Sequence, residues 1–492
     1  MIARWVDPNV RSSLALGAIL LCVAGLVLLG RGPVRPGGPD AHPLIGSLLS
    51  LGSDDTRQDD YRTSSSRFSE RGLRGRFALS HPKLLASGRR QLHAEFSVQS
   101  DDELTPARHE PISFVLVLDT SGSMAGRKLV DARNAVLSLF DQIHADDKVA
   151  LVSFASRAEV LVPLVQASRG RRRVREALDR TQAVGSTDIA GALSTAASLL
   201  SSGPERTQRI VLVTDGRDTS GAPRNSASRL ALRQADRGVT VSALGIGADY
   251  DDAYLGDLAD AGRGNYAFVS DTPALARFIS RELDETARTT ARRIVAHVTL
   301  PHGVQVLDVS GGTWTIHGNE LRLTLGSLFG GDTRRAVVTL EAQTEEPGQT
   351  LEFRTWVEWD RVGDGEVQTQ VARVLAQVVG DAASVEEALD HSVTASIASI
   401  QASELELAAS RAFEKGDRAR ALELNRQSQA LVARAAEAPA PAPVAARLRA
   451  QKRAYEGDAH AYRTKPKAAA APAARSIGAR ERTNMDRMEV GY

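Results

Sequence analysis

A short polar run that directly follows an apolar stretch has the clearest chemistry in this sequence. Asp119, Ser121 and Ser123 stand at alternate positions after the apolar segment 112–118. A carboxylate and two hydroxyl groups supply hard oxygen ligands, which suit Mg²⁺ or Mn²⁺ better than a softer metal. Gly122 permits the tight turn that would bring the two serines together. We therefore expect a cation-binding loop at the end of a buried strand.

Two later loops carry the other expected ligands. Thr187 lies in the polar run 185–188, and Asp215 follows the apolar segment 210–213. Loops at the carboxyl ends of strands in a doubly wound sheet converge on one crevice, so distant residues can share one ion. Because neutral hydroxyl groups leave a cation only partly neutralised, a carboxylate from a partner is the expected last ligand. Asp188 is assigned a different role, as the N-cap of the following helix.

The elements around these loops alternate between strands and helices. From 111 to 290, short apolar segments rich in β-branched residues are separated by segments with helical spacing. The apolar segments are 114–118, 149–154, 210–213 and 239–244. This order predicts an α/β fold with a doubly wound, mainly parallel sheet covered by helices on both faces.

Outside residues 111–290, the spacing of apolar residues distinguishes further segments. Residues 291–380 show a period of two, which is typical of an antiparallel β-sandwich, and strands within 68–110 are expected to join it. Residues 384–435 predict a helical hairpin with a turn at 415–417. A tetratricopeptide unit is the alternative, but a single unit cannot bury its own face. Residues 436–492 are dominated by Ala, Pro and Arg, which predicts disorder.

The N-terminal part, residues 1–31, predicts a membrane segment. Between Arg11 and Arg31 the chain is uncharged and apolar over roughly the twenty residues needed to cross a bilayer. Because a small-x-small cleavage site is missing, we expect a signal anchor and a single-pass membrane protein with its body in the periplasm or outside the cell; export after signal cleavage is the alternative. Residues 32–67 predict a flexible linker. Cys22 is the single cysteine, so disulfides and thiolate metal sites are excluded from the body.

Length and charge exclude some classes of protein. With 492 residues, the chain is long enough for two or three domains. A net charge of +1 provides no basic excess for binding nucleic acid. The oligomeric state stays open.

Catalytic interpretations are weaker. Residues 119–122 superficially resemble the D-T-G loop of acid proteases, but Ser121 interrupts the triplet and the surrounding βαβ order does not fit an all-β protease. The G-x-S-x-G, P-loop and H-E-x-x-H motifs are missing from the sequence. A hydrolase is the least favoured alternative. The main alternative is a non-catalytic scaffold whose contacts come from the β-sandwich and helices, with a structural metal.

Taken together, the three loops resemble the metal-ion-dependent adhesion site of the von Willebrand factor type A family. That family has a D-x-S-x-S loop after its first strand, a threonine in a Gly-rich second loop and an aspartate in a T-D-G third loop. The metal ligands implied by this resemblance are Asp119, Ser121, Ser123, Thr187 and Asp215. It further implies Mg²⁺, Mn²⁺ or Ca²⁺ as the cation and a role in adhesion through a carboxylate of a partner protein. Ser186 stands where the family often has a second Gly, which should alter backbone freedom and not ligation.

The order of segments is also similar to that of other proteins. An anchor, short strands, a type A domain and a β-sandwich resemble bacterial surface or periplasmic members of the family. Those members are related to inter-alpha-trypsin-inhibitor heavy chains and calcium-activated-chloride-channel-like proteins.

Overall fold

The computed structural model describes residues 64–70, 72–101, 111–200, 206–247, 250–269, 272–363 and 367–487. The chain divides into two units, 1–59 and 60–492, and all of the described residues belong to the second unit. The expected anchor and most of the expected linker lie outside the described residues. The linker prediction extends too far, because Ser65–Glu70 forms strand β1. Within the described ranges, no helix has both the length and the apolar character that crossing a bilayer requires.

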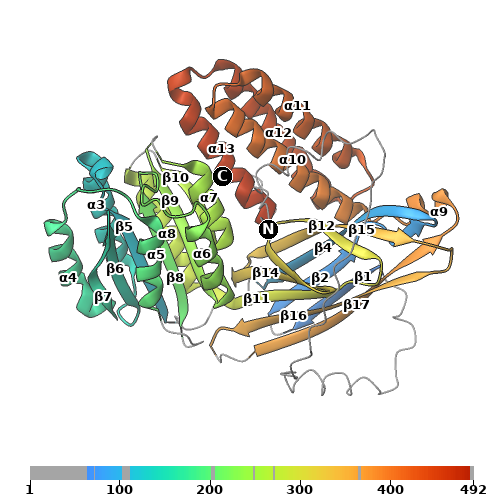
Figure 1. Ribbon diagram of the computed structural model, residues 1–492, viewed down its shortest axis with the longest axis horizontal. Coiled ribbons are helices and arrows are strands. Elements are labelled where there is room, and N and C mark those ends of the chain that lie inside the picture. Colours follow the sequence, from blue (N-terminus) through green and yellow to red (C-terminus); the bar gives the residue numbers. More distant parts are fainter. Residues whose placement is uncertain are drawn as a thin grey trace, which may run out of the picture. The chain divides into compact units, whose positions relative to one another are not determined.

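Six strands form the α/β sheet in the order β10-β9-β8-β5-β6-β7 (Figure 1). They are β5 (Ile112–Asp119), β6 (Lys148–Phe154), β7 (Ala158–Gln166), β8 (Thr207–Thr214), β9 (Val239–Ile246) and β10 (Arg263–Val269). Neighbouring strands are parallel, except that β6 and β7 are antiparallel. The predicted doubly wound, mainly parallel sheet is confirmed. Every residue of β5, β8 and β9 is buried, because helices cover both faces of the sheet.

Alternate side chains of β5 belong to two different cores. Phe114 and Leu116 pack with residues of α3, α4 and α8. Val115 and Val117 pack with residues of α5, α6 and α7 on the other face. The helices are α3 (Arg127–Gln142), α4 (Ala167–Arg180), α5 (Ile189–Ser198), α6 (Ser226–Asp236), α7 (Asp252–Ala261) and α8 (Thr272–Ala287). The strand ends are thereby held rigidly, which fixes the loops that follow them.

Two further sheets form a β-sandwich, with strand orders β1-β2-β4-β15-β12 and β13-β14-β11-β16-β17-β3. The strands before the α/β domain are β1, β2 (Leu73–Leu79), β3 (Lys83–Leu85) and β4 (Gly88–Ser100). The strands after it are β11 (Thr289–Thr299), β12 (Val304–Ser310), β13 (Thr313–His317), β14 (Glu320–Phe329), β15 (Thr333–Thr344), β16 (Thr350–Arg361) and β17 (Val367–Val379). All pairings are antiparallel except the short pair of β3 and β17.

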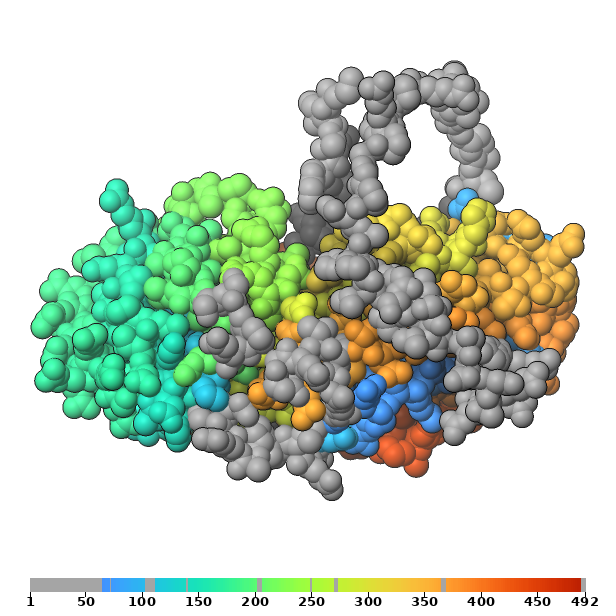
Figure 2. Space-filling view, turned by 90° about the horizontal axis from the view of Figure 1, so that it is seen from below, coloured from blue at the N-terminus to red at the C-terminus, as the bar shows by residue number. Residues whose placement is uncertain are grey.

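The α/β domain is inserted into this sandwich. Strand β4 precedes the domain and β15 follows it, yet the two pair along their length, from Gly88 opposite Thr344 to Gln99 opposite Thr333. In the space-filling view, blue residues from the start of the described chain adjoin orange residues from the strands after the domain (Figure 2). The first and last residues of the α/β domain are therefore tied to neighbouring parts of one sandwich.

The prediction of disorder for residues 436–492 is wrong for the described part of this segment, residues 436–487. Helices α9 (Ala382–Glu387), α10 (His391–Glu414) and α11 (Arg418–Glu437) are followed by α12 (Ala442–Thr464) and α13 (Ala470–Arg487). Tyr455 and Tyr462 of α12 are fully buried, and Arg480 of α13 pairs with Asp458 at 2.5 Å. The Ala and Arg content suggested low complexity, but alanines allow helices to pack closely and the arginines find acidic partners.

Helix α13 contacts both of the other domains. Arg475 donates to the backbone oxygens of Gly247 (3.2 Å) and Tyr250 (3.3 Å), and its guanidinium carbon lies 4.3 Å from the centre of the Tyr250 ring. Arg335 of β15 donates to the backbone oxygen of Asn484 at 2.8 Å. The C-terminal segment thus connects the α/β domain with the β-sandwich.

Candidate metal site

The first loop folds back over the end of β5. Asp119 is fully buried, and its Oδ1 accepts a hydrogen bond of 2.7 Å from the backbone N–H of Ser121. The hydroxyl oxygens of Ser121 and Ser123 lie 3.0 Å apart. A single turn of 3₁₀-helix begins at Gly122, directly after this bend. The spacing of one residue therefore brings the two hydroxyl groups to the same side of the loop.

The second loop lies directly against the first. Gly185 adopts a φ of +85°, which favours glycine, and its carbonyl oxygen accepts a hydrogen bond of 3.1 Å from the N–H of Gly122. The hydroxyl group of Ser186 donates to Ser156 at 2.9 Å, away from the serines of the first loop. Asp188 caps α5 by accepting a hydrogen bond from the N–H of Gly191, as predicted. Thr187 is left as the buried hydroxyl residue of this loop.

The third loop closes the arrangement from β8. The Thr214 hydroxyl group donates to the Asp119 carboxylate, and the Ser123 hydroxyl group donates to Oδ1 of Asp215 at 2.7 Å. Asp215 is fully buried. Side chains that are 92 residues apart in the sequence are thus in direct contact.

Oxygen atoms from the first two loops lie around Gly216 of the third loop. A Cβ atom added to Gly216 would lie 3.2 Å from Oγ1 of Thr187, 3.5 Å from Oγ of Ser123 and 3.7 Å from Oδ2 of Asp119. A side chain at position 216 would therefore crowd these oxygen atoms. Hydroxyl and carboxylate oxygens gathered around a small space fit a hard divalent cation. The described residues contain no cluster of three or more His, Cys, Asp or Glu side chains suited to a metal, so hydroxyl groups are essential to any site here.

Charge is unevenly compensated at this site. Burial raises the pKa of Asp119 above its usual range, and the hydrogen bonds from Thr214 and Ser121 oppose that rise. The nearby charge of Asp215 raises the pKa of Asp119 further. A divalent cation would favour the ionised form of Asp119.

Two contributors were missing from the sequence-based set of ligands. Thr214 orients Asp119, and Lys128 of α3 places its ammonium nitrogen 2.5 Å from Oδ2 of Asp215. Thr214 could have been found from its place directly before Asp215. Lys128 offered only a weak signal, a basic residue close after the loop at 119–123.

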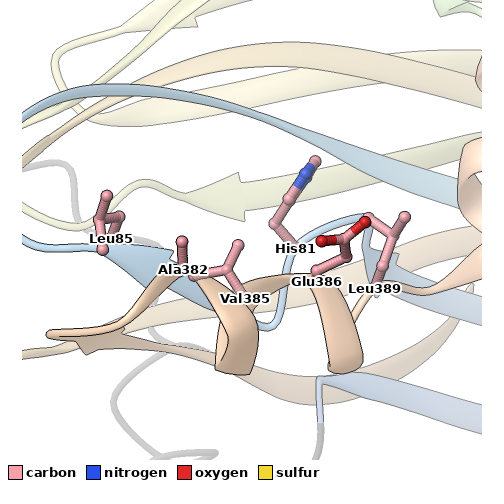
Figure 3. A pocket seen from close by; sticks show the side chains of 6 residues that line it. All are labelled: His81, Leu85, Ala382, Val385, Glu386 and Leu389. Atoms are coloured by element: carbon pink, nitrogen blue, oxygen red, sulfur yellow. The ribbon is translucent and has the colours of Figure 1, made fainter.

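A separate depression of about 260 Å³ lies on the β-sandwich side, beside α9 (Figure 3). Its lining residues are His81, Leu85, Ala382, Val385, Glu386 and Leu389. Burial lowers the pKa of His81, which favours a neutral ring. None of these lining residues belongs to the three metal loops.

Relatives of the chain match it over part of its length. The uncharacterized protein sll0103 of Synechocystis is 25% identical over 291 residues, which cover 57% of this chain and 68% of that protein. Human inter-alpha-trypsin inhibitor heavy chain H4 is 33% identical over 159 residues, which cover 30% of this chain but only 17% of that protein. The chain therefore spans most of the cyanobacterial relative and a small part of the human one.

Solved structures with the same fold extend over more of the chain. A von Willebrand factor type A protein from Catenulispora acidiphila aligns with a TM-score of 0.59 and 19% identity, covering 79% of this chain and 93% of its own. The ArnB paralog VWA2 from Sulfolobus acidocaldarius aligns with a TM-score of 0.56 and 12% identity, covering 85% of this chain and 98% of its own. Residues 114–281 match the family model of the von Willebrand factor type A domain, and the chain thus contains a domain of this family.

Proposed function

We propose that this chain binds a partner protein through a divalent cation held by the three loops of its type A domain. The ligand set comprises Asp119, Ser121, Ser123, Thr187 and Asp215. The main support is the convergence of oxygens from Asp119, Ser123 and Thr187 on the space beside Gly216. When bound, Mg²⁺ or Mn²⁺ would supply an open coordination position for a carboxylate of the partner.

The composition of the site favours binding over catalysis. Its hydroxyl groups are neutral, and its two carboxylates equal the charge of a divalent cation. Because Asp215 is also paired with Lys128, one positive charge remains for an acidic group of a partner. The hydroxyl group of Ser123 donates to Asp215, a weakly basic carboxylate whose charge is already shared with Lys128, which makes it a poor base for activating a nucleophile. Ser123 and the neighbouring Gly185 are exposed, so a partner can approach the site directly.

A metal titration is the first test. Isothermal titration calorimetry with Mg²⁺ and Mn²⁺ should show one site, and Asp119→Ala should weaken the affinity by about 100-fold or more. Asp131→Ala is the matched control, since it removes a carboxylate of α3 that pairs with the largely exposed Arg127. Equal affinities for the wild type and Asp119→Ala would contradict the proposed ligand set.

Partner recognition needs a second test. Immobilised peptides that differ only in Glu versus Gln should capture the protein through Glu alone, and EDTA should abolish this capture. Binding of a natural partner that survives both EDTA and Asp119→Ala would instead favour the scaffold alternative. Exposed apolar side chains on the β-sandwich support that alternative, including Trp314, Ile316 and Val371.

The proposal includes attachment to a membrane by residues 1–31, with the body outside the cytoplasm. The uncharged apolar stretch between Arg11 and Arg31 supports it. A reporter fused after Gly32 should be active only outside the cytoplasm. A reporter active in the cytoplasm would reject this orientation.

A further inference from the structure

The Lys128 ammonium group occupies the side of Asp215 that faces α3. Its nitrogen lies 2.5 Å from Oδ2 of Asp215 and 3.5 Å from the backbone oxygen of Ser123. The side chain of Asp215 is fully buried, whereas that of Lys128 is 30% exposed. A positive charge of the protein itself therefore neutralises one of the proposed metal ligands.

Both carboxylate oxygens of Asp215 have partners within the protein. Oδ1 accepts a hydrogen bond from Ser123, and Oδ2 contacts Lys128. Asp119 is similar, because Oδ1 accepts from the N–H of Ser121 and Oδ2 accepts from Thr214. The difference is that only Asp215 has a cation as its partner. A divalent cation entering the site would have to share Asp215 with the Lys128 ammonium group or displace that group.

The Lys128 side chain lies against the loop after β9. Gly247 in this loop has a φ of +75°, and a Cβ atom added there would lie 3.3 Å from Cε of Lys128. The backbone oxygen of Gly247 accepts a hydrogen bond from Arg475 of α13. Helix α13 thus holds the loop at Gly247, and Lys128 lies against this loop. The position of Lys128 therefore depends on tertiary contacts.

We propose that Lys128 is a built-in competitor for the metal at Asp215. In the metal-free protein it compensates the buried carboxylate, and it lowers the affinity of the site for divalent cations because two cations then share one carboxylate. This inference rests on the proposed metal-dependent function. It goes further because a residue outside the ligand set, Lys128, then determines how much free Mg²⁺ is needed to fill the site.

The test replaces Lys128 without shortening its apolar stem. Lys128→Met should tighten Mg²⁺ binding by about tenfold, as measured by calorimetry, because the competing charge at Asp215 is gone. Arg127→Met is the matched control: it removes a charge next in the sequence whose side chain is 90% exposed and pairs with Asp131. This control should change the affinity by less than about twofold, since exposed charges are strongly screened.

A second readout does not depend on affinity. In EDTA, Lys128→Met should melt at a lower temperature than the wild type, because Asp215 loses its counter-charge, and saturating Mg²⁺ should remove that difference. Equal Mg²⁺ affinities of Lys128→Met and wild type would overturn this inference alone. Absence of Mg²⁺ binding by both proteins would overturn the proposed metal-dependent function as well.

Discussion

Two regions of this protein combine buried carboxylates with hydroxyl groups, and they differ in their access to solvent. One is the set of metal loops at the end of the α/β sheet. The other is the helical polar cluster, which lies between α10, α11, α12 and α13 and comprises Glu406, Asp458, Glu481, Tyr455 and Tyr462. Hydroxyl groups donate to carboxylates in both regions, so access to solvent, more than the residue types, separates a site from a structural core.

In the helical polar cluster the hydroxyl groups donate into the carboxylates. Glu406 accepts hydrogen bonds from Tyr462 (2.8 Å), Ser428 (2.9 Å) and Asn425 (2.9 Å), and it is fully buried. Burial raises the pKa of Glu406 to about 8, and the charge of Asp458 contributes to the rise. The cluster is therefore saturated by its own donors and closed to solvent.

In the metal loops, hydroxyl groups also donate to carboxylates, from Ser123 to Asp215 and from Thr214 to Asp119. These loops differ from the cluster because the backbone N–H group of Ser121 supplies a further donor to Asp119 and because Ser123 is exposed. Helices cannot offer such backbone donors from their interior, since their N–H groups are already paired. Loops are consequently where a buried carboxylate can receive backbone donors while a neighbouring hydroxyl group stays accessible to an external cation.

The largest expected effect concerns the helical polar cluster. Tyr462→Ala should reduce the free energy of unfolding by about 3–5 kcal/mol, because a fully buried aromatic side chain is lost. Its Mg²⁺ affinity should be unchanged wherever the variant is folded. Urea denaturation and calorimetry measure the two quantities. Altered metal affinity in the folded variant would show that the two regions are not independent.

The pH dependence of stability should also distinguish the regions. The folded chain keeps the Glu406 proton between about pH 4.5 and about pH 8, where the unfolded chain has released it. Raising the pH through this range therefore lowers stability, by up to about 1.4 kcal/mol per pH unit for one proton. Glu406→Gln should lack this contribution, so its stability relative to the wild type should rise with pH in urea denaturation series. Glu423→Gln on the exposed surface is the control, and parallel curves for Glu406→Gln and wild type would contradict the assignment.

A smaller effect is expected in the metal loops. Thr187→Ala should weaken Mg²⁺ binding by about tenfold, which corresponds to about 1.4 kcal/mol, with little change in melting temperature. Ser186→Ala removes the neighbouring hydroxyl group, which bonds to Ser156 instead, and should leave the affinity unchanged. Equal losses from both variants would mean that the loop, and not the Thr187 oxygen, determines binding.

Much of the α/β domain could be predicted from the sequence. Its strands are short, apolar and rich in β-branched residues, so the local pattern of 114–118 or 210–213 is sufficient to indicate buried strands. The loop 119–123 could be recognised for the same reason, because its chemistry is carried by adjacent residues. The meeting of Asp119 and Gly216 then follows from the parallel sheet, which brings strand ends to one edge. Thr187 instead lies in the loop between α4 and α5, and tertiary packing brings it to the same place.

The tail could not be predicted in this way. Residues 442–464 lack a strong apolar stripe, and their order depends on contacts with distant segments, such as Tyr462 with Glu406. Composition alone therefore indicated disorder, whereas tertiary packing makes the segment helical. The stability of a helix in a protein derives mainly from such packing and not from local propensity.

The sequence by itself determined the types of oxygen ligand and the strands that carry them, since both are local properties of the chain. Only the tertiary structure decided that Lys128 faces Asp215, that Thr214 orients Asp119 and that Arg475 holds the loop at Gly247. These contacts join residues from about 90 to more than 200 positions apart, and no local periodicity encodes them. The physical reason is that a side chain's partner is set by where folded elements meet, which depends on the packing of the whole core.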